Sequence, residues 1–247
     1  MNTVPVEVRE LNKQFKDESR GTVVAVDGAS FTCERGEIFG LLGANGAGKT
    51  TTLRMLATVL QPSGGSASVM GHNVVKEPER VRESIGFYTA STALYPRLTA
   101  RETVAFFARI NGVAERSIKD RTEELVSGFG LTDYADVLVD KLSQGMKQKV
   151  SIARIVAHDP PVLIFDEPTV GLDVLNAIEM QKMIGGFRDS GKTVLFSTHI
   201  MSEAEKLCDR IAVIHRGQIL ACDTLEGLRS ATGRHYLEDI FVSLVEQ

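Results

Sequence analysis

The sequence predicts an α/β fold in which a helical segment interrupts a core built on a mixed sheet. Two short apolar stretches, 37–42 and 162–166, have the continuous hydrophobic character of strands buried on both faces of a sheet. Each runs into a distinctive polar segment, the glycine-rich 43–50 after the first and Asp166-Glu167 after the second. Between them, from about residue 91 to 158, apolar residues take the three- and four-residue spacing of helices.

The N-terminal part is predicted to consist mostly of strands. Alternating valines indicate a strand over 4–10, and two further strands, 23–26 and 29–33, are separated by Asp27-Gly28. The strand 37–42 precedes a helix that begins near Lys49 and presents one apolar face, made of Leu53, Leu56, Val59 and Leu60. Strands at 66–70 and 85–88 follow.

Helix signals dominate the insert. The sequence Thr99-Ala100-Arg101-Glu102 is a capping box, and the helix that it starts is predicted to end at Asn111-Gly112. Further helices are expected over 117–127 and 133–138. Ser143 is the expected N-cap of a longer helix that reaches about residue 158.

The remainder returns to alternating strands and helices. The expected order is strand 162–166, helix 174–189, strand 193–197, helix 202–208, a hairpin of 211–215 and 218–221, and two short helices. We therefore predict a single domain with a core of 1–90 and 159–230, an insert of 91–158 and a tail of 231–247.

The bulk composition excludes several classes of protein. The chain has 247 residues and a net charge of −4, whereas a general nucleic-acid binder more often has a basic domain. Cys33, Cys208 and Cys222 are far apart in sequence, which predicts free thiols in a reducing compartment. No apolar run approaches the roughly 20 residues that a membrane helix needs, and the first ten residues do not resemble a signal peptide.

The glycine-rich segment predicts a phosphate-binding loop. Gly-x₄-Gly-Lys-Thr between a strand and a helix lets backbone N–H groups surround an anion at a helix N-terminus. Lys49 is expected to reach the β- and γ-phosphates of ATP, and the Thr50 hydroxyl to ligate Mg²⁺. The predicted ATP-binding set in this loop is Asn45, Gly46, Ala47, Gly48, Lys49, Thr50 and Thr51.

The two carboxylates after strand 162–166 predict a hydrolytic site. Ligands bind at the carboxyl ends of such strands, so Asp166 is expected to hold Mg²⁺ through water. Glu167 is then placed to polarise the attacking water as a general base. His199, at the end of the next strand, is a candidate contact to the γ-phosphate.

A third motif resembles that of a known family. Leu142-Ser143-Gln144-Gly145-Met146 is similar to the Leu-Ser-Gly-Gly-Gln signature of ATP-binding-cassette (ABC) proteins, although it differs from it at Gln144 and Met146. The resemblance implies an ABC ATPase core with an N-terminal antiparallel β portion, in which Ser143 and Gly145 contact ATP. It also implies that Phe15 stacks on adenine with Val24 beside it, that Gly171-Leu172-Asp173 is the D-loop, and that His199 is the switch histidine.

The same resemblance implies partners and a location. Such chains form head-to-tail dimers, either homodimers or pairs with a related cassette, and energise a separate transmembrane permease from the inner, cytoplasmic face of the cell membrane. The stretches 36–43, 94–102, 207–210 and 237–241 are similar to ATPase subunits of the NatA type, which serve sodium-extruding exporters, and of related drug exporters.

One position departs from the family pattern. Ala90 stands where the family usually has a glutamine that contacts Mg²⁺ and senses the membrane subunit. Shortly after it, Leu94, Tyr95, Pro96 and Leu98 fall where the resemblance implies docking of a permease helix, between core and insert. At least one of them is expected to be exposed.

Two other classes of function fit the sequence less well. A soluble ABC ATPase that acts on nucleic acid or ribosomes usually has two cassettes or a long coiled-coil insert, and the acidic charge also argues against it. A P-loop kinase or GTPase needs neither the signature-like motif nor Glu167. We therefore expect no nucleic-acid partner.

Overall fold

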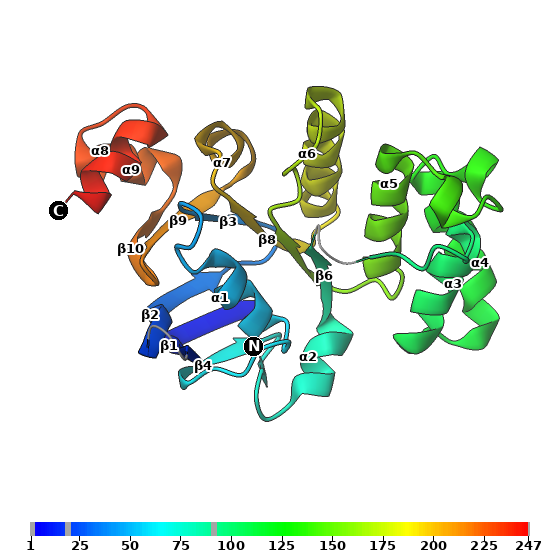
Figure 1. The fold of residues 1–247 in the computed structure, drawn as a ribbon, viewed down its shortest axis with the longest axis horizontal. Helices are drawn as coiled ribbons and strands as arrows, with labels where there is room; N and C mark the ends of the chain where they lie inside the picture. Colours follow the sequence, from blue (N-terminus) through cyan, green and yellow to red (C-terminus); the bar gives the residue numbers. More distant parts are fainter. Residues whose placement is uncertain (1–2, 18–20, 90–92, 247) are drawn as a thin grey trace. The chain divides into compact units, whose positions relative to one another are not determined.

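The computed structural model describes residues 3–17, 21–89 and 93–246 and divides the chain into two compact units. The first unit contains residues 1–85 and 161–247, and the second contains residues 86–160. Figure 1 shows strands and helices in the first unit and a group of helices in the second. The predicted α/β fold with a mixed sheet is thereby confirmed.

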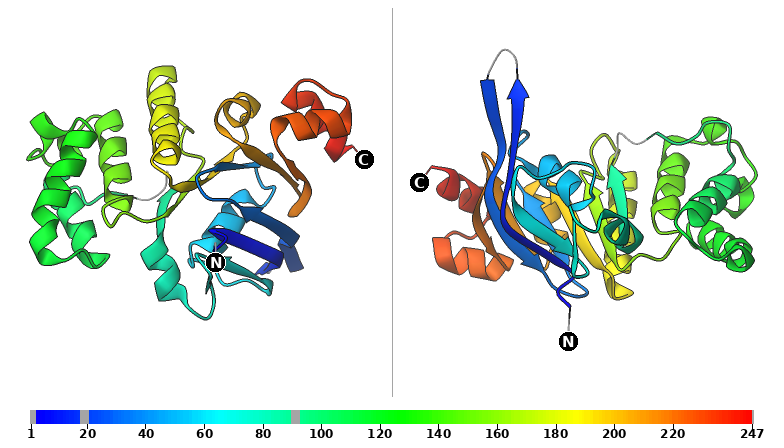
Figure 2. Two further views of the ribbon diagram at one scale, coloured as in Figure 1. Left: turned by 180° about the vertical axis from the view of Figure 1, so that it is seen from behind. Right: turned by 90° about the horizontal axis from the view of Figure 1, so that it is seen from below.

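A four-stranded antiparallel sheet, ordered β2-β1-β4-β5, opens the first unit. Its strands are β1 (Val6–Asp17), β2 (Gly21–Cys33), β4 (Gly64–Val69) and β5 (His72–Asn73). The expected break at Asp27-Gly28 is wrong, because β2 continues through it with irregularities in its pairing to β1. Gly28 takes a φ of 63°, so the residue that signalled a turn lies in a distorted stretch of strand. The right-hand view of Figure 2 shows β1 and β2 as two long strands that run side by side.

The larger sheet is mixed. Its order is β10-β9-β3-β8-β7-β6, and β9, β3, β8 and β7 run parallel while β10 is antiparallel to β9. The strands are β3 (Ile38–Leu42), β6 (Ile85–Thr89), β7 (Val162–Asp166), β8 (Thr193–Thr198), β9 (Arg210–His215) and β10 (Gln218–Asp223). All residues of β3, β7 and β8 are buried, which explains the apolar runs of β3 and β7 and the apolar centre of β8. The chain passes from the first unit to the second within β6.

Helices connect the strands of the first unit. They are α1 (Lys49–Leu56), α2 (Pro78–Ser84), α6 (Val174–Asp189), α7 (Met201–Leu207), α8 (Leu225–Thr232) and α9 (Leu237–Val245). Helix α1 contacts β7 of the large sheet and β2 and β4 of the small one. It ends at Leu56, so the expected apolar face is too long: Val59 lies beyond the helix and is 60% exposed. Leu237 and Ile240 of α9 are buried in one cluster with Leu42 and Val213.

The second unit is helical. It contains α3 (Ala100–Ile110), α4 (Glu115–Gly128), α5 (Gln144–Ile155) and 3₁₀ turns at Thr132–Tyr134 and Val139–Lys141. The capping box of Thr99 and Glu102 is confirmed, as is the Ser143 cap, which accepts a hydrogen bond from the Met146 N–H. The helix expected over 133–138 is wrong, because only the 3₁₀ turn Thr132–Tyr134 overlaps this range and the second turn begins after it. No helix in the described ranges is long and apolar enough to span a bilayer.

Candidate nucleotide-binding and hydrolysis site

The phosphate loop lies between β3 and α1, as its sequence predicts. Close packing explains two of its glycines. A Cβ on Gly48 would lie 2.5 Å from the Ala25 carbonyl oxygen, and the residue has a φ of 109°. A Cβ on Gly43 would lie 2.3 Å from the Ile214 carbonyl oxygen. The backbones of β2 and β9 thus pack closely against the loop and leave no room for a side chain at these two positions. Helix α1 begins directly after the loop.

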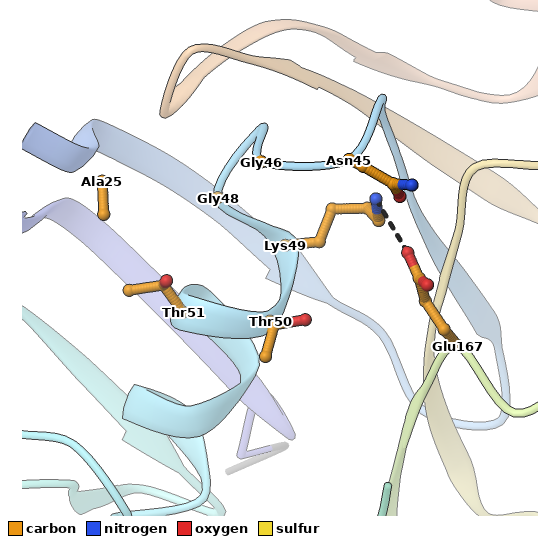
Figure 3. Close-up of a pocket in the computed structure, with 8 residues that line it drawn as sticks. All are labelled: Ala25, Asn45, Gly46, Gly48, Lys49, Thr50, Thr51 and Glu167. Atoms are coloured by element: carbon orange, nitrogen blue, oxygen red, sulfur yellow. Dashed lines mark ion pairs between the residues drawn. The ribbon is translucent and has the colours of Figure 1, made fainter. Parts of the chain in front are cut away.

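An open pocket of about 210 Å³ lies over this loop. Its lining residues are Ala25, Asn45, Gly46, Gly48, Lys49, Thr50, Thr51 and Glu167. Figure 3 shows the Lys49 side chain pointing across the pocket to Glu167, which comes from the segment after β7. The N-terminus of α1 and a cation therefore face the same space, which is the arrangement that binds a phosphate group.

Lys49 is held by three oxygen atoms although its side chain is almost wholly buried. Its Nζ donates to the carbonyl oxygens of Gly43 and Ala44, at 2.8 and 3.1 Å, and lies 3.0 Å from Glu167 Oε1. A buried ammonium without partners would be costly, so these contacts fix the lysine in an extended position at the pocket wall.

Glu167 sits in an unusual backbone conformation. Its φ of 46° lies in the left-handed region, which is uncommon for a residue with a side chain and which clusters at functional sites. Partial burial by itself would raise the pKa of its carboxyl group. The hydrogen bond and charge of Lys49, with a smaller contribution from His199, outweigh that effect and lower the pKa below the usual 4.5. The carboxylate is thus ionised at neutral pH and is able to accept a proton.

Asp166 is the last residue of β7 and is buried beside Thr50. Its Oδ1 accepts hydrogen bonds from the hydroxyls of Thr50, at 3.0 Å, and of Ser197, at 2.8 Å. A hydroxyl and a carboxylate oxygen side by side suit Mg²⁺, which usually binds one or two carboxylates together with substrate phosphates. No cluster of three or more His, Cys, Asp or Glu residues occurs in the described part of the chain, and a Mg²⁺ shared with phosphates needs none.

His199 follows β8 and contacts the carboxylate of Glu167. Its Nδ1 lies 3.3 Å from Glu167 Oε1. An ionised carboxylate only accepts hydrogen bonds, so this contact requires a proton on Nδ1. The structure thereby brings together Lys49, Thr50, Asp166, Glu167 and His199 from three segments of the chain.

The aromatic candidate and its expected neighbour lie on opposite faces of the hairpin. Phe15 in β1 is 39% exposed and pairs with Val23, whereas Val24 pairs with Gln14. Since side chains alternate along a strand, Val24 faces away from Phe15 and not beside it. Lys13 Nζ lies 5.1 Å from the centroid of the Phe15 ring. Ala25 lines the phosphate pocket and was not foreseen, because a small apolar residue in a strand gives no chemical signal.

Ser143 and Gly145 belong to the second unit and are not among the residues that line the pocket. They lie at the start of α5, where backbone N–H groups favour an anion. Ala47, a residue of the phosphate loop itself, is buried and does not line the pocket either. Ala90, with its neighbours Ser91 and Thr92, lies outside the described residues.

The second unit also carries an exposed aromatic group. Tyr95 is 53% exposed, and its ring lies 5.8 Å from that of Phe106 and 6.4 Å from that of Phe107. Ile110, one turn along α3 from Phe106, is 58% exposed. By contrast, Leu94 packs against the core of this unit. We refer to Tyr95, Phe106 and Ile110 as the aromatic patch.

Comparison with known proteins gives consistent results. The family model described as "ABC transporter" matches residues 26–170. The ABC transporter ATP-binding protein NatA of Bacillus subtilis is 41% identical over 96% of this chain and 97% of its own length. The daunorubicin/doxorubicin resistance ATP-binding protein DrrA of Streptomyces peucetius is 39% identical over 96% of this chain and 71% of its own length.

A solved structure of an ATP-binding subunit of an ABC transporter has a similar fold. The two chains superpose with a TM-score of 0.85 at 30% identity, covering 97% of this chain and 99% of the other.

Proposed function

Because this chain belongs to the ATP-binding subunits of ABC transporters and is an ATPase, we propose that it hydrolyses ATP in the pocket described above to drive export by a separate membrane permease. The observation that carries the proposal is the ion pair between Lys49 and Glu167 in the pocket over the phosphate loop. A binding module needs the lysine alone, whereas hydrolysis also needs a carboxylate beside the γ-phosphate.

The proposed catalytic residues are Lys49, Glu167 and His199. When phosphates enter the pocket they compete with Glu167 for the Lys49 ammonium, and Lys49 then stabilises the charge on the β- and γ-phosphates. Released from the lysine, Glu167 accepts a hydrogen bond from the attacking water and takes its proton. His199, whose Nδ1 faces Glu167, holds that carboxylate in place or turns to the γ-phosphate.

Mg²⁺, bound by Thr50 and, through water, by Asp166, would neutralise phosphate charge in this site. We further propose that Phe15 stacks on adenine, since its ring is exposed at the edge of the hairpin. Asn45, Gly46, Ala47, Gly48 and Thr51 complete the phosphate site through the loop backbone.

A second copy of the chain, or a related cassette, is proposed to complete the site. Ser143 offers a hydroxyl and Gly145 an unobstructed backbone N–H at the start of α5, and both suit a γ-phosphate held by the other copy. The two units of each chain are thus parts of one ABC ATPase domain, and each ATP lies between the phosphate loop of one copy and the signature-like motif of the other.

The permease is proposed to dock on the aromatic patch, which puts this chain at the cytoplasmic face of the cell membrane. The exported substrate is proposed to be sodium, following the NatA-type resemblance. A drug is the second candidate, because DrrA, a drug-resistance protein by name, has nearly the same identity to this chain as NatA has.

Purification of the tagged chain from detergent-solubilised cells tests the function as a whole. We expect a hydrophobic membrane protein to co-purify and the ATPase rate of the complex to exceed that of the isolated chain. Recovery of ribosomes or nucleic acid in its place would support the alternative of a soluble ABC ATPase.

A further inference from the structure

A single buried hydroxyl connects the Asp166 carboxylate to the backbone of Glu167 in the hydrolysis site. Ser197 is the fifth residue of β8, is 0% exposed and pairs in register with Asp166 of β7. Its Oγ lies 2.8 Å from Asp166 Oδ1 and 3.0 Å from the backbone nitrogen of Glu167. One side chain therefore contacts the proposed metal-binding residue and the proposed base.

The chemistry of the partners fixes the direction of both hydrogen bonds. The Glu167 N–H can only donate, and Asp166 Oδ1 accepts from Ser197 as it does from Thr50. The Ser197 hydroxyl must then accept from Glu167 and give its one proton to Asp166. A threonine can make the same pair of bonds in principle, a cysteine can make them only weakly, and alanine makes neither.

The backbone of Glu167 needs such support. A glutamate with a φ of 46° occupies a sparsely populated, strained region that persists only when neighbouring contacts enforce it. The Ser197 hydroxyl binds the amide of this very residue, so it holds the backbone from which the catalytic side chain projects.

We propose that Ser197 is a positioning residue for ATP hydrolysis, which sets the place of the Asp166 carboxylate and of the Glu167 backbone relative to each other. The inference rests on the proposed role of Glu167 as the base. Small errors matter here, because a displacement of about 1 Å in a catalytic group can cost on the order of 10²-fold in rate.

The test compares Ser197→Ala with Thr193→Val. Thr193 lies in the same strand, is also buried, and its hydroxyl likewise makes two hydrogen bonds, to the Glu34 carbonyl and from the Gly36 N–H. Both substitutions remove a buried hydroxyl from β8, but only Ser197→Ala removes one that contacts the Asp166 carboxylate and the Glu167 amide. The full-length variants are assayed for ATP affinity, for kcat and for the Mg²⁺ concentration that gives half the maximal rate.

We expect Ser197→Ala to lower kcat by roughly 10- to 100-fold, to raise the Mg²⁺ requirement, and to change ATP affinity by less than about 2-fold. Thr193→Val should match the wild type in all three. In a Glu167→Gln background, Ser197→Ala should cause a smaller loss of rate than in the wild type, because part of the effect of the serine passes through that glutamate. Equal kcat values for Ser197→Ala and Thr193→Val would overturn the inference, as would fully additive losses in the double variant.

Ser197→Cys keeps the assay decisive if the alanine variant does not fold. The thiol preserves the shape and is a weak donor, so kcat should fall between the wild-type and alanine values. If the alanine variant does not fold and has no measurable kcat, the kcat of Ser197→Cys should still be below that of the wild type. Wild-type kcat in the cysteine variant would contradict the inference. An active Glu167→Gln enzyme would instead reject the proposed function, so the two failures are distinguishable.

Discussion

Lys49 and Glu167 form an ion pair, with 3.0 Å between Nζ and Oε1, across the pocket that the phosphate loop encloses. The cation proposed to hold the β- and γ-phosphates is thus paired with the carboxylate proposed to activate water. On the proposed mechanism, phosphate and Glu167 compete for one ammonium, so nucleotide binding would also release the base. The pair would then keep the base occupied until a γ-phosphate is present.

The substitution Glu167→Gln should separate binding from turnover. The amide cannot take a proton, and loss of a general base typically costs about 10²–10⁴-fold, so kcat should fall by that amount. ATP affinity should be no weaker than in the wild type, because the neutral amide competes less for Lys49. Steady-state ATPase rates and titration with a fluorescent ATP analogue measure the two quantities.

Glu238→Gln is the matched control, since it neutralises an exposed carboxylate of α9. It should leave both quantities unchanged. A wild-type rate in Glu167→Gln would remove this residue from the mechanism.

The ion pair also predicts a pH dependence of stability. The pKa of Glu167 is lowered in the folded chain, so its contribution to the free energy of unfolding is present above the ordinary value of 4.5 and is lost as the pH falls through the lowered one. The stability difference between the wild type and Glu167→Gln should therefore shrink on acidification. Urea unfolding of both proteins from about pH 6 to pH 3 measures it. A difference that stays constant over this range would mean that the pair does not stabilise the fold.

Ser143→Asp tests the composite site without removing the helix cap. The Ser143 side chain caps α5, so a bulky replacement would damage the helix, whereas aspartate is an equally good N-cap. Its negative charge should repel the γ-phosphate held by the other copy and abolish hydrolysis, while ATP binding to a single copy stays normal. Ser143→Thr, which keeps both cap and hydroxyl, serves as the control.

Mixing supplies the decisive measurement. A dimer of one Ser143→Asp chain and one Lys49→Ala chain has one site in which both the phosphate loop and the signature-like motif are intact. ATPase activity should therefore return on mixing two inactive proteins. If Ser143→Asp weakened ATP binding to the isolated copy, the residue would act within its own chain.

The site residues with a chemical signature could be predicted from the sequence, and the others could not. Lys49, Asp166 and Glu167 follow strands whose uninterrupted apolar character reflects burial on both faces, and the structure brings them into one site. Ser197 gave no signal, because a hydroxyl inside a buried strand looks like any other strand residue until its register with Asp166 is known. The resemblance implies Val24 beside Phe15, but only the pairing of the hairpin shows that Val23 is the residue opposite Phe15.

The errors in secondary structure have a similar origin. Asp27-Gly28 looks like a turn, but pairing with β1 on one side carries β2 through it. The segment 133–138 is too short to form a stable helix by itself. Only a 3₁₀ turn at Thr132–Tyr134 forms there, and Ala135, directly after it, is buried in the core of the second unit. Tertiary contacts decided both cases.

The aromatic patch leads to the last prediction. Tyr95 packs its ring against Phe106 on an exposed surface of the second unit, whereas a tyrosine that only filled the core would be buried. Tyr95→Asp should therefore leave folding and basal ATPase activity nearly unchanged and abolish co-purification with the permease, because a charge in an apolar contact must be desolvated.

Tyr236→Asp is the matched control: it alters another tyrosine, 62% exposed, that precedes α9 in the first unit. Co-purification should survive in Tyr236→Asp. Equal recovery of the permease with both variants would place the docking surface away from Tyr95, and loss of the folded state in Tyr95→Asp alone would identify its ring as part of the packing of α3.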